Sequence, residues 1–337
     1  MDIPLRNIYY ILSYAWKYFK PGDLSKVDAK DFKNEAEFFA EIFDMTLAKY
    51  LKKGLYRDYV VQSDSLQTIK GKVDFNASMK LLGSGLKKLE CIYDDYTANN
   101  GVNQLIFATS HTLLKSEISK DQAKSIKRKL VYFNNVSLLR ADKTLISSVK
   151  SVRGNHTLNF LINISKYIQS NLGFNQANGK YDLNNFVQKG MGLVFENFVY
   201  NFYLTKFPAY QVRNGEHIKW DSDDQDGLYP TMKTDITIRK NDIVLVIDAK
   251  YYKSMFNYHY LSPDKPKFIS QNIYQLYTYL SNFKDDNRRV EGMLLYPNTT
   301  ATIRNERLIS GKKMMIYNIN LNQDWKDIES EMLGIIN

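Results

Sequence analysis

An apolar run that ends in opposite charges constrains the fold more than any other feature of the sequence. Residues 243–247 are all apolar and lead directly into Asp248, Ala249 and Lys250. A short continuous apolar run is typical of a strand buried on both faces of a sheet. Residues 232–239 alternate as a strand does, and "RKND" at 239–242 suits a turn. The two segments predict a β-hairpin inside a sheet.

The hairpin predicts which charged side chains meet. With the turn centred near Asn241, residues whose numbers sum to about 482–483 face each other, so Asp235 and Asp248, which sum to 483, become cross-strand neighbours. Asp248 and Lys250 share one face because side chains along a strand alternate. The sequence therefore predicts two carboxylates and one ammonium group at one end of a sheet.

Such a pair of acids needs a cation between them. Opposed carboxylates repel, and Lys250 offsets only part of that repulsion. The carboxylates of Asp235 and Asp248, with the backbone carbonyl of Ala249, would form a partial shell for Mg²⁺. A metal and a lysine arranged in this way suit phosphodiester hydrolysis. The alternative is a solvated Asp248–Lys250 pair on a surface hairpin, and the apolar run weighs against it.

The D-x-K pattern alone is not diagnostic. It also begins at Asp28, Asp31 and Asp324. Asp28 and Asp31 lie in a polar stretch that leads toward a helix, and Asp324 stands at the start of a C-terminal helix. Only Asp248 follows a strand that the pattern predicts to be buried.

Length and cysteine content exclude several classes of protein. The chain has 337 residues, which suits two domains or one large one, and we place a boundary near Gly154. Its single cysteine, Cys91, excludes an internal disulfide and a cysteine-based zinc site. No apolar run approaches the ~20 residues of a membrane span, and no signal peptide is recognisable, so we expect a cytoplasmic protein without membrane contact. The expected domains are 1–153 and 154–337.

Helical periodicity recurs along the chain, and strand patterns separate the helices. We expect strands with a tight turn at Lys70–Gly71 between residues 56 and 75. The predicted helices cover residues 7–19, 34–54, 103–117, 121–130, 159–173, 185–207 and 270–280.

The chain is basic and rich in tyrosine. Its net charge is +10, and it contains 25 tyrosines. Residues 112–153 carry ten Lys and Arg against three Asp and Glu. This composition suits a polyanionic partner such as nucleic acid, and it equally suits a lysine-rich solvated surface.

The hairpin constellation resembles the PD-(D/E)XK nuclease superfamily. An acid, a hairpin's span and an acid-x-Lys that closes an apolar strand match its pattern, although Thr234 stands where the motif has proline. In the next helix, Gln275 and Tyr279 are similar to the Q-x-x-x-Y element of RecB-like nucleases. A packed Tyr279 and a solvated Gln275 are the alternative for these two residues.

Five ordered motifs resemble the McrC family, the nuclease subunits of McrBC modification-dependent (type IV) restriction systems. They are "IPLRNIYYILSYAW", "GLVFENF", "TDITI", "IDAKYYKS" and "SQNIYQLYTYL", and the likeness runs from residue 3 to about residue 297. The resemblance implies an α/β protein with an α+β N-terminal partner-docking domain. It also implies a C-terminal PD-(D/E)XK endonuclease domain, whose central mixed sheet is flanked by helices.

The same resemblance implies the site and its cofactor. Asp235, Asp248 and Lys250 would be catalytic, with Mg²⁺ held by the two aspartates and Ala249. Glu196, in "GLVFENF", would add a further metal-binding acid, and the alternative for it is an ordinary helix-surface glutamate.

The resemblance further implies a McrB-like AAA+ GTPase hexamer as partner and double-stranded DNA, modified at cytosine, as substrate. GTP would be bound by that partner, because "GSGLKK" at 83–88 lacks the ending of a G-x-x-x-x-G-K-[ST] loop. An element near Lys70–Gly71 would be inserted for partner contact. Two other classes remain open: a nuclease-like scaffold that docks and activates the partner, and a stand-alone nucleic-acid-binding protein.

Overall fold

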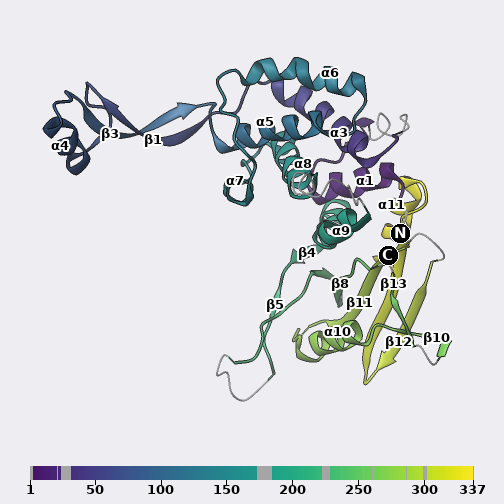
Figure 1. Cartoon of the computed structure of the whole chain (residues 1–337). Helices are drawn as coiled ribbons and strands as arrows, with labels where there is room; N and C mark the ends of the chain where they lie inside the picture. Colours follow the sequence, from purple (N-terminus) through teal and green to yellow (C-terminus); the bar gives the residue numbers. More distant parts are fainter. Residues whose placement is uncertain are drawn as a thin grey trace. The chain divides into compact units, whose positions relative to one another are not determined.

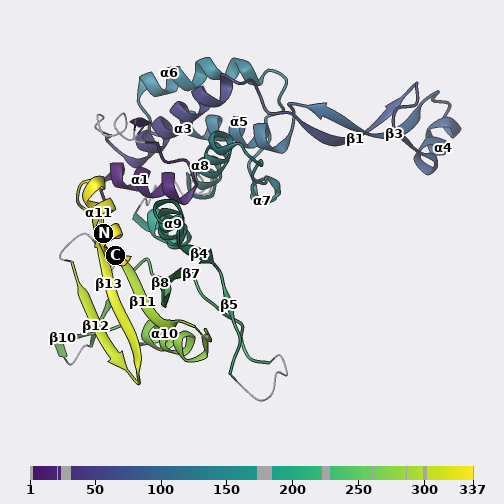
Figure 2. The same ribbon diagram turned by 180° about the vertical axis from the view of Figure 1, so that it is seen from behind.

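The computed structural model divides the chain into two compact units. Unit 1 combines Met1–Asp31 with Asp182–Asn337, and unit 2 is Phe32–Tyr181. Both contain helices and strands, which confirms the expected α/β class (Figures 1 and 2). The structure describes residues 3–20, 22–23, 32–172, 184–221, 228–252, 254–259, 262–285, 287–298 and 302–336. Asp28 and Asp31 lie outside these residues.

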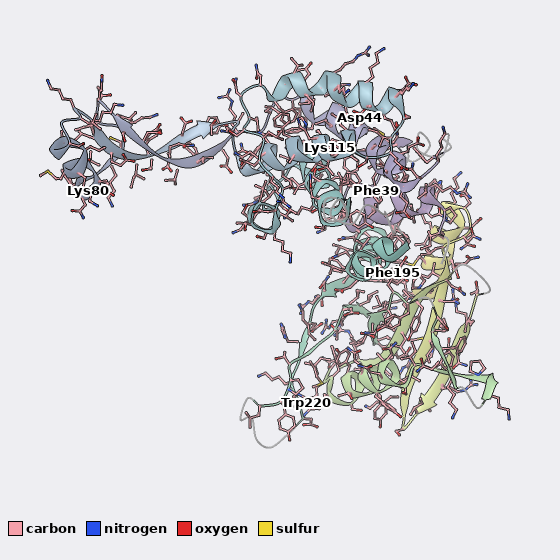
Figure 3. All side chains as sticks on the ribbon, viewed as in Figure 1. Phe39, Asp44, Lys80, Lys115, Phe195 and Trp220 are labelled. Carbon is pink, nitrogen blue, oxygen red and sulfur yellow. The ribbon has the colours of Figure 1, made fainter. Side chains whose placement is uncertain are left out.

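Unit 2 contains a cluster of helices. Polar caps start several of them: Asn34 accepts a hydrogen bond from the backbone of Glu37, and Ser119 and Gln122 form a capping box. The longest two, α3 and α8, pack together through rings such as Phe39 and Tyr167 (Figure 3 labels Phe39). The helices are α3 (Glu35–Leu51), α5 (Gly101–Leu114), α6 (Lys120–Lys129), the 3₁₀ turn η1 (Leu130–Phe133), α7 (Lys143–Ser148) and α8 (His156–Leu172).

Unit 2 also contains a three-stranded antiparallel sheet that extends away from its helices (Figure 1). Its strands are β1 (Asp58–Leu66), β2 (Lys72–Asp74) and β3 (Leu89–Thr97), and α4 (Phe75–Gly83) joins the last two. At Lys70–Gly71, where a tight turn was expected, the chain bends, with Gly71 at φ +68°. The strands on either side of it do not pair, however, because β3 lies between them.

Unit 1 is built on a six-stranded mixed sheet in the order β12-β13-β11-β8-β7-β4. β11 runs parallel to β8 and β13, whereas β7 pairs antiparallel with β8. The mixed sheet expected for the C-terminal region is thus confirmed. Its strands are β4 (Gln211–Asn214), β7 (Ile236–Lys240), β8 (Ile243–Ala249), β11 (Arg289–Asn298), β12 (Arg304–Ile309) and β13 (Lys312–Asn320).

Helices flank this sheet. α10 (Ser270–Asn282) packs on β11, where a Cβ on Gly292 would lie 2.7 Å from Leu280 and 2.9 Å from Leu276. Glycine therefore allows the helix to approach the strand closely. α9 (Asn184–Lys206) contacts β4, β7 and β8, and α1 (Leu5–Ala15) packs along α9 (Figure 2). α11 (Trp325–Ile336) follows Asp324, as the sequence predicted.

Two short ribbons complete unit 1. β5 (His217–Ile218) pairs with β6 (Met232–Lys233), and β9 (Phe256–His259) pairs with β10 (Ser262–Phe268). None of the helices in the described part of the chain is long and apolar enough to cross a membrane.

The two units differ from the expected domains, 1–153 and 154–337. The first residues belong with the C-terminal part because α1 packs along α9, where Asn201 donates a hydrogen bond to the carbonyl of Ala15. Residues after Gly154 belong with unit 2 because α8 packs on α3 and α5. Unit 2 is therefore inserted between two segments of unit 1.

Candidate active site

The β7–β8 hairpin has the predicted register. Ile236 lies opposite Ile247, and the pairing continues unbroken to Lys240 and Ile243. A two-residue turn closes it, with Asn241 at φ +49°, a conformation that asparagine adopts more readily than most residues. The next pair beyond Ile236 and Ile247 is Asp235 and Asp248, so the two acids occupy the positions expected.

Asp235 lies at the bend that precedes β7 and is half-buried. Its Oδ2 accepts a hydrogen bond of 2.9 Å from the backbone N–H of Ala249, on the neighbouring strand. Burial raises the pKa of the Asp235 carboxyl, while this hydrogen bond and Lys250 oppose the rise. The hydrogen bond fixes the carboxylate beside the end of β8.

Asp248 is fully buried, at 0% exposure. Its Oδ2 forms an ion pair with Lys250, whose Nζ lies 2.9 Å away. Burial raises the pKa of the Asp248 carboxyl to about 7, Asp235 adds to the rise, and Lys250 opposes it. Two buried carboxylates that share one lysine are costly unless a further cation or proton joins them.

Lys250 links the acids to α10. Its Nζ donates to Gln275 Oε1 at 3.1 Å, and Gln275 Nε2 donates to the hydroxyl of Tyr279 at 2.7 Å. Its backbone N–H bonds the carbonyl of Leu295 on β11 at 2.9 Å. Burial lowers the pKa of the Lys250 ammonium, but Asp248 and Asp235 outweigh burial, so the pKa is raised and the group stays charged. Gln275 and the buried Tyr279 are thus connected to the acids.

Glu196 projects from α9 and is half-buried. Burial raises the pKa of its carboxyl, Asp235 raises it further, and Lys233 and Lys250 lower it. Glu196 therefore lies within electrostatic range of the site. Within the described ranges, however, no group of three or more His, Cys, Asp or Glu side chains is close enough to hold a metal ion.

Asp235 and Asp248 could hold a divalent cation. The Asp235 carboxylate is fixed at the end of β8, and the buried Asp248 carboxylate can accept a further cation beside it. Ala249 enters the site through its N–H group, and the role expected for its carbonyl stays a prediction. The metal-binding role of Glu196 also stays a prediction.

The sequence interpretation missed Lys233. It lies two residues before Asp235, and its positive charge lowers the pKa of both the Asp235 and Glu196 carboxyls. The K-x-D spacing on a strand, which puts both side chains on one face, was the available signal.

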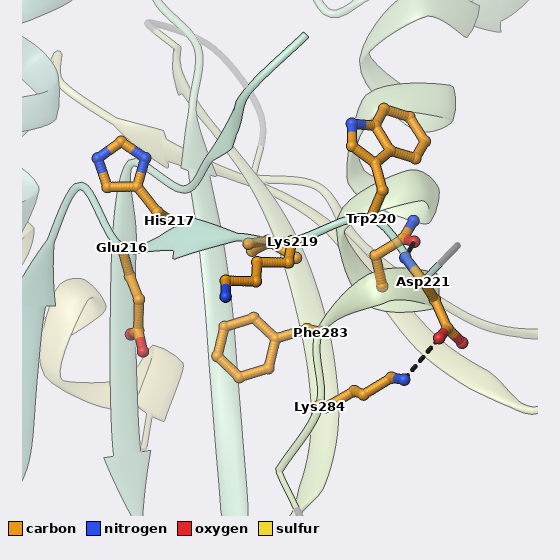
Figure 4. Close-up of a pocket in the computed structure, with 9 residues that line it drawn as sticks. Glu216, His217, Lys219, Trp220, Asp221, Phe283 and Lys284 are labelled. Carbon is orange, nitrogen blue, oxygen red and sulfur yellow. Dashed lines mark hydrogen bonds and ion pairs between the residues drawn. The ribbon is translucent and has the colours of Figure 1, made fainter. Parts of the chain in front are cut away.

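A pocket of about 380 Å³ lies beside this region but is distinct from the acidic pair. An ion pair of 2.6 Å between Lys284 and Asp221 borders it (Figure 4). None of the predicted site residues lines it; the lining consists of Glu216, His217, Ile218, Lys219, Trp220, Asp221, Asn282, Phe283 and Lys284.

Comparisons with known proteins cover nearly the whole chain. Residues 6–297 match the family model described as "McrBC 5-methylcytosine restriction system component". The chain is 30% identical, over 99% of its length and 97% of the relative's, to the "Type IV methyl-directed restriction enzyme EcoKMcrBC" of Escherichia coli (strain K12).

One solved structure shares the fold. It is described as a half-complex from a tetradecameric assembly of Thermococcus gammatolerans McrB AAA+ hexamers with bound McrC. The match has a TM-score of 0.50 and 16% identity, and it covers 99% of this chain and 76% of the other. Every residue of the candidate site lies inside the region that the family model matches.

Proposed function

The chain belongs to the family of McrBC 5-methylcytosine restriction system components, and from this premise we propose that it is the Mg²⁺-dependent endodeoxyribonuclease subunit of an McrBC-like complex. The observation that supports this proposal best is the state of Asp248. A carboxylate at 0% exposure, paired with the Lys250 ammonium and beside a second acid, is unfavourable in a purely structural role. A bound metal ion would offset this unfavourable free energy.

Each residue of the site has its own role in the proposed reaction. Asp235 and Asp248 would hold Mg²⁺, with Glu196 and the Ala249 carbonyl as further ligands. When bound, the ion would polarise the phosphodiester and lower the pKa of a water molecule. Lys250 stays protonated and is held by Asp248 and Gln275, so its ammonium group is pre-oriented to stabilise charge on the reacting phosphate. Tyr279 supports this arrangement by fixing Gln275.

The partner that we propose is a McrB-like AAA+ GTPase hexamer. The solved structure that shares the fold contains McrB AAA+ hexamers with bound McrC, and the curated relative is a methyl-directed restriction enzyme. The chain has no complete phosphate-binding loop motif of its own, so it would stimulate GTP hydrolysis by the partner instead of hydrolysing GTP. Double-stranded DNA containing methylcytosine would be the substrate, and the complex would act in the cytoplasm.

The three-stranded sheet of unit 2 is the proposed docking element. Tyr59, Val61 and Tyr96 expose large apolar side chains on it, and such side chains on a thin sheet favour a protein partner. The Lys70–Gly71 turn, expected to lie in an inserted element, belongs to this region.

The second candidate is a nuclease-like scaffold that serves only to dock and activate the AAA+ partner. The connected set of Asp235, Asp248 and Lys250 argues against it, because a scaffold has no need of a buried acid pair.

A reconstituted complex tests the proposal. The chain would be co-purified with the product of the neighbouring gene and incubated with GTP, Mg²⁺ and either methylated or unmethylated duplex DNA. We expect cleavage only of methylated DNA, only with both proteins, and none when EDTA replaces Mg²⁺. GTPase stimulation without any DNA cleavage would favour the scaffold.

A further inference from the structure

The short β5–β6 ribbon leads directly into the candidate site. His217 pairs with Lys233, and Ile218 pairs with Met232. Ile218 and Met232 are buried in the core of unit 1, whereas Lys233 is exposed on the opposite face of the ribbon. Two residues later the same strand segment reaches Asp235.

Gly215 determines where the side chain of Lys233 lies. The Gly215 N–H donates to the carbonyl of Asp235 at 3.1 Å, so Gly215 and Asp235 face each other across the two chain segments. A Cβ added to Gly215 would lie 3.1 Å from Lys233 Nζ and closer still to its Cε. The side chain of Lys233 therefore extends over Gly215, toward Asp235 and away from the far end of the ribbon.

The position needs glycine for a second reason. Gly215 has φ +67°, which residues with a Cβ rarely adopt. The backbone conformation disfavours a side chain at this position, and a Cβ here would displace the end of the Lys233 side chain.

The ammonium group of Lys233 lies near acids but is bound by neither. Its charge acts on the carboxyls of Asp235 and Glu196. It forms no ion pair and no hydrogen bond within the described part of the chain, whereas Lys250 is engaged by both Asp248 and Gln275. Lys233 therefore keeps its three donors for a group that the protein does not supply.

We propose that Lys233, directed by Gly215, binds a phosphate of the substrate DNA beside the Asp235–Asp248 pair. This inference rests on the proposed function, because it takes DNA as the substrate of that site. An exposed ammonium near a catalytic acid pair is a phosphate ligand of the compact, point-charge type. Lys250 then serves the reacting phosphate, and Lys233 holds the strand in register next to it.

Binding measured without divalent cations separates this role from catalysis. The fluorescence anisotropy of a labelled duplex oligonucleotide would be followed against concentration of the full-length chain at several salt concentrations. We expect Lys233→Ala to weaken binding about three- to tenfold at 0.1 M salt and to reduce the salt slope by about one unit.

Lys219→Ala is the matched control. Lys219 is an exposed lysine beside the same ribbon, and it is not among the main charges that act on Asp235 or Glu196. Its loss removes the same charge and is expected to change binding less than twofold. Equal losses for the two variants would overturn the proposal, since they would report only the net charge of the chain.

Gly215→Ala tests how the lysine is directed. It is expected to reproduce the loss seen with Lys233→Ala, and the double variant is expected to lose no more than either single one. If Gly215→Ala lowers the melting temperature, Lys233→Arg is used instead. This variant keeps the positive charge, so its DNA affinity is expected to stay within about twofold of the wild type.

One further outcome would overturn the inference. If Lys233→Ala changes the Mg²⁺ concentration needed for cleavage but leaves DNA affinity and salt slope unchanged, Lys233 acts only on the carboxylates. Failure of the inference can be told from failure of the proposed function. Loss of cleavage in Asp248→Ala together with unchanged DNA binding in Lys233→Ala would reject the phosphate contact alone.

Discussion

The six-stranded sheet of unit 1 buries its apolar side chains, whereas the three-stranded sheet of unit 2 exposes several of them. In the six-stranded sheet of unit 1, the central strand β8 is buried from Val244 to Asp248. In the three-stranded sheet of unit 2, β1 exposes Tyr59 at 70% and Val61 at 67%. A sheet that is covered by helices is held by its own core, whereas the thin sheet leaves apolar surface for another molecule.

The two sheets also differ in where their acidic side chains lie. Asp248 is fully buried on a strand that pairs with β7 on one side and β11 on the other, and Lys250 is its ion-pair partner. On the thin sheet, Glu90 lies at the surface and accepts hydrogen bonds from Ser63 and Ser65. Unit 1 thus encloses a charged pair, whereas unit 2 exposes apolar side chains and satisfies its acid with surface hydroxyls.

The sharpest test of this contrast is Asp248→Ala. We expect DNA cleavage by the complex to fall at least about a thousandfold, because the metal site loses its buried ligand. Stimulation of the partner's GTPase is expected to stay within about twofold of wild type, since that role is assigned to unit 2. Measurable cutting by the variant with Mg²⁺ would reject the site, and loss of stimulation would mean that the two roles are not separate.

Matched valine substitutions compare the two sheets directly. Val246 in β8 is 0% exposed, so Val246→Ala should lower the free energy of unfolding of unit 1 by about 2 kcal/mol. Val61→Ala, in exposed β1, should change stability by less than about 0.5 kcal/mol. Tryptophan fluorescence during urea unfolding reports unit 1, because Trp16, Trp220 and Trp325 all belong to it. Far-UV circular dichroism follows the unfolding of both units. Equal losses of unfolding free energy in Val246→Ala and Val61→Ala would show that the two sheets do not differ in this way.

The exposed tyrosines test the contact role of unit 2. Tyr59 and Tyr96 pair across β1 and β3 with their ring centroids 5.1 Å apart. Replacing both with serine should reduce stimulation of the partner's GTPase about tenfold, because exposed aromatic side chains often dominate binding energy. Tyr132→Ser, at an exposed position on η1, is the control and should have little effect. Unchanged stimulation in the double variant would place docking elsewhere.

The smallest expected effect is a dependence of stability on pH. Burial raises the pKa of the Asp248 carboxyl to about 7 from an ordinary value of 3.8, so the folded state holds the proton more tightly than the unfolded state. The resulting stabilisation is complete at acidic pH and is lost as pH rises through about 7.

In metal-free buffer, the melting temperature of unit 1 should therefore fall between pH 5 and pH 8 by about 3 °C more in the wild type than in Asp248→Asn. Added Mg²⁺ should restore the wild type at pH 8 but not the variant. Parallel pH profiles for the two proteins would show that Asp248 is not the group that titrates.

The sequence was sufficient where the interactions are local. The two-residue turn at Asn241 fixes the register of the hairpin, so the opposition of Asp235 and Asp248 followed from counting residues. The i, i+4 spacing similarly put Gln275 and Tyr279 on one helix face, where a hydrogen bond joins them.

Pairings between distant segments were not accessible in the same way. The order β1-β3-β2 depends on β3, which follows a helix, so the turn at Gly71 suggested a hairpin that does not form. The partner of α1 lies in α9, far along the chain, and no local pattern marks that contact. Lys233 was missed because its position depends on Gly215, which lies in the bend between β4 and β5.

The packing of α1 along α9 also has a consequence for how the protein is made. At roughly 5–20 residues per second, a ribosome needs on the order of 10 to 30 s to synthesise the chain between these helices. Tyr9, Tyr10 and Leu12 are fully buried in the finished protein, yet their partner does not exist during that interval. The apolar face of α1 therefore stays without its partner helix while the residues of unit 2 are synthesised.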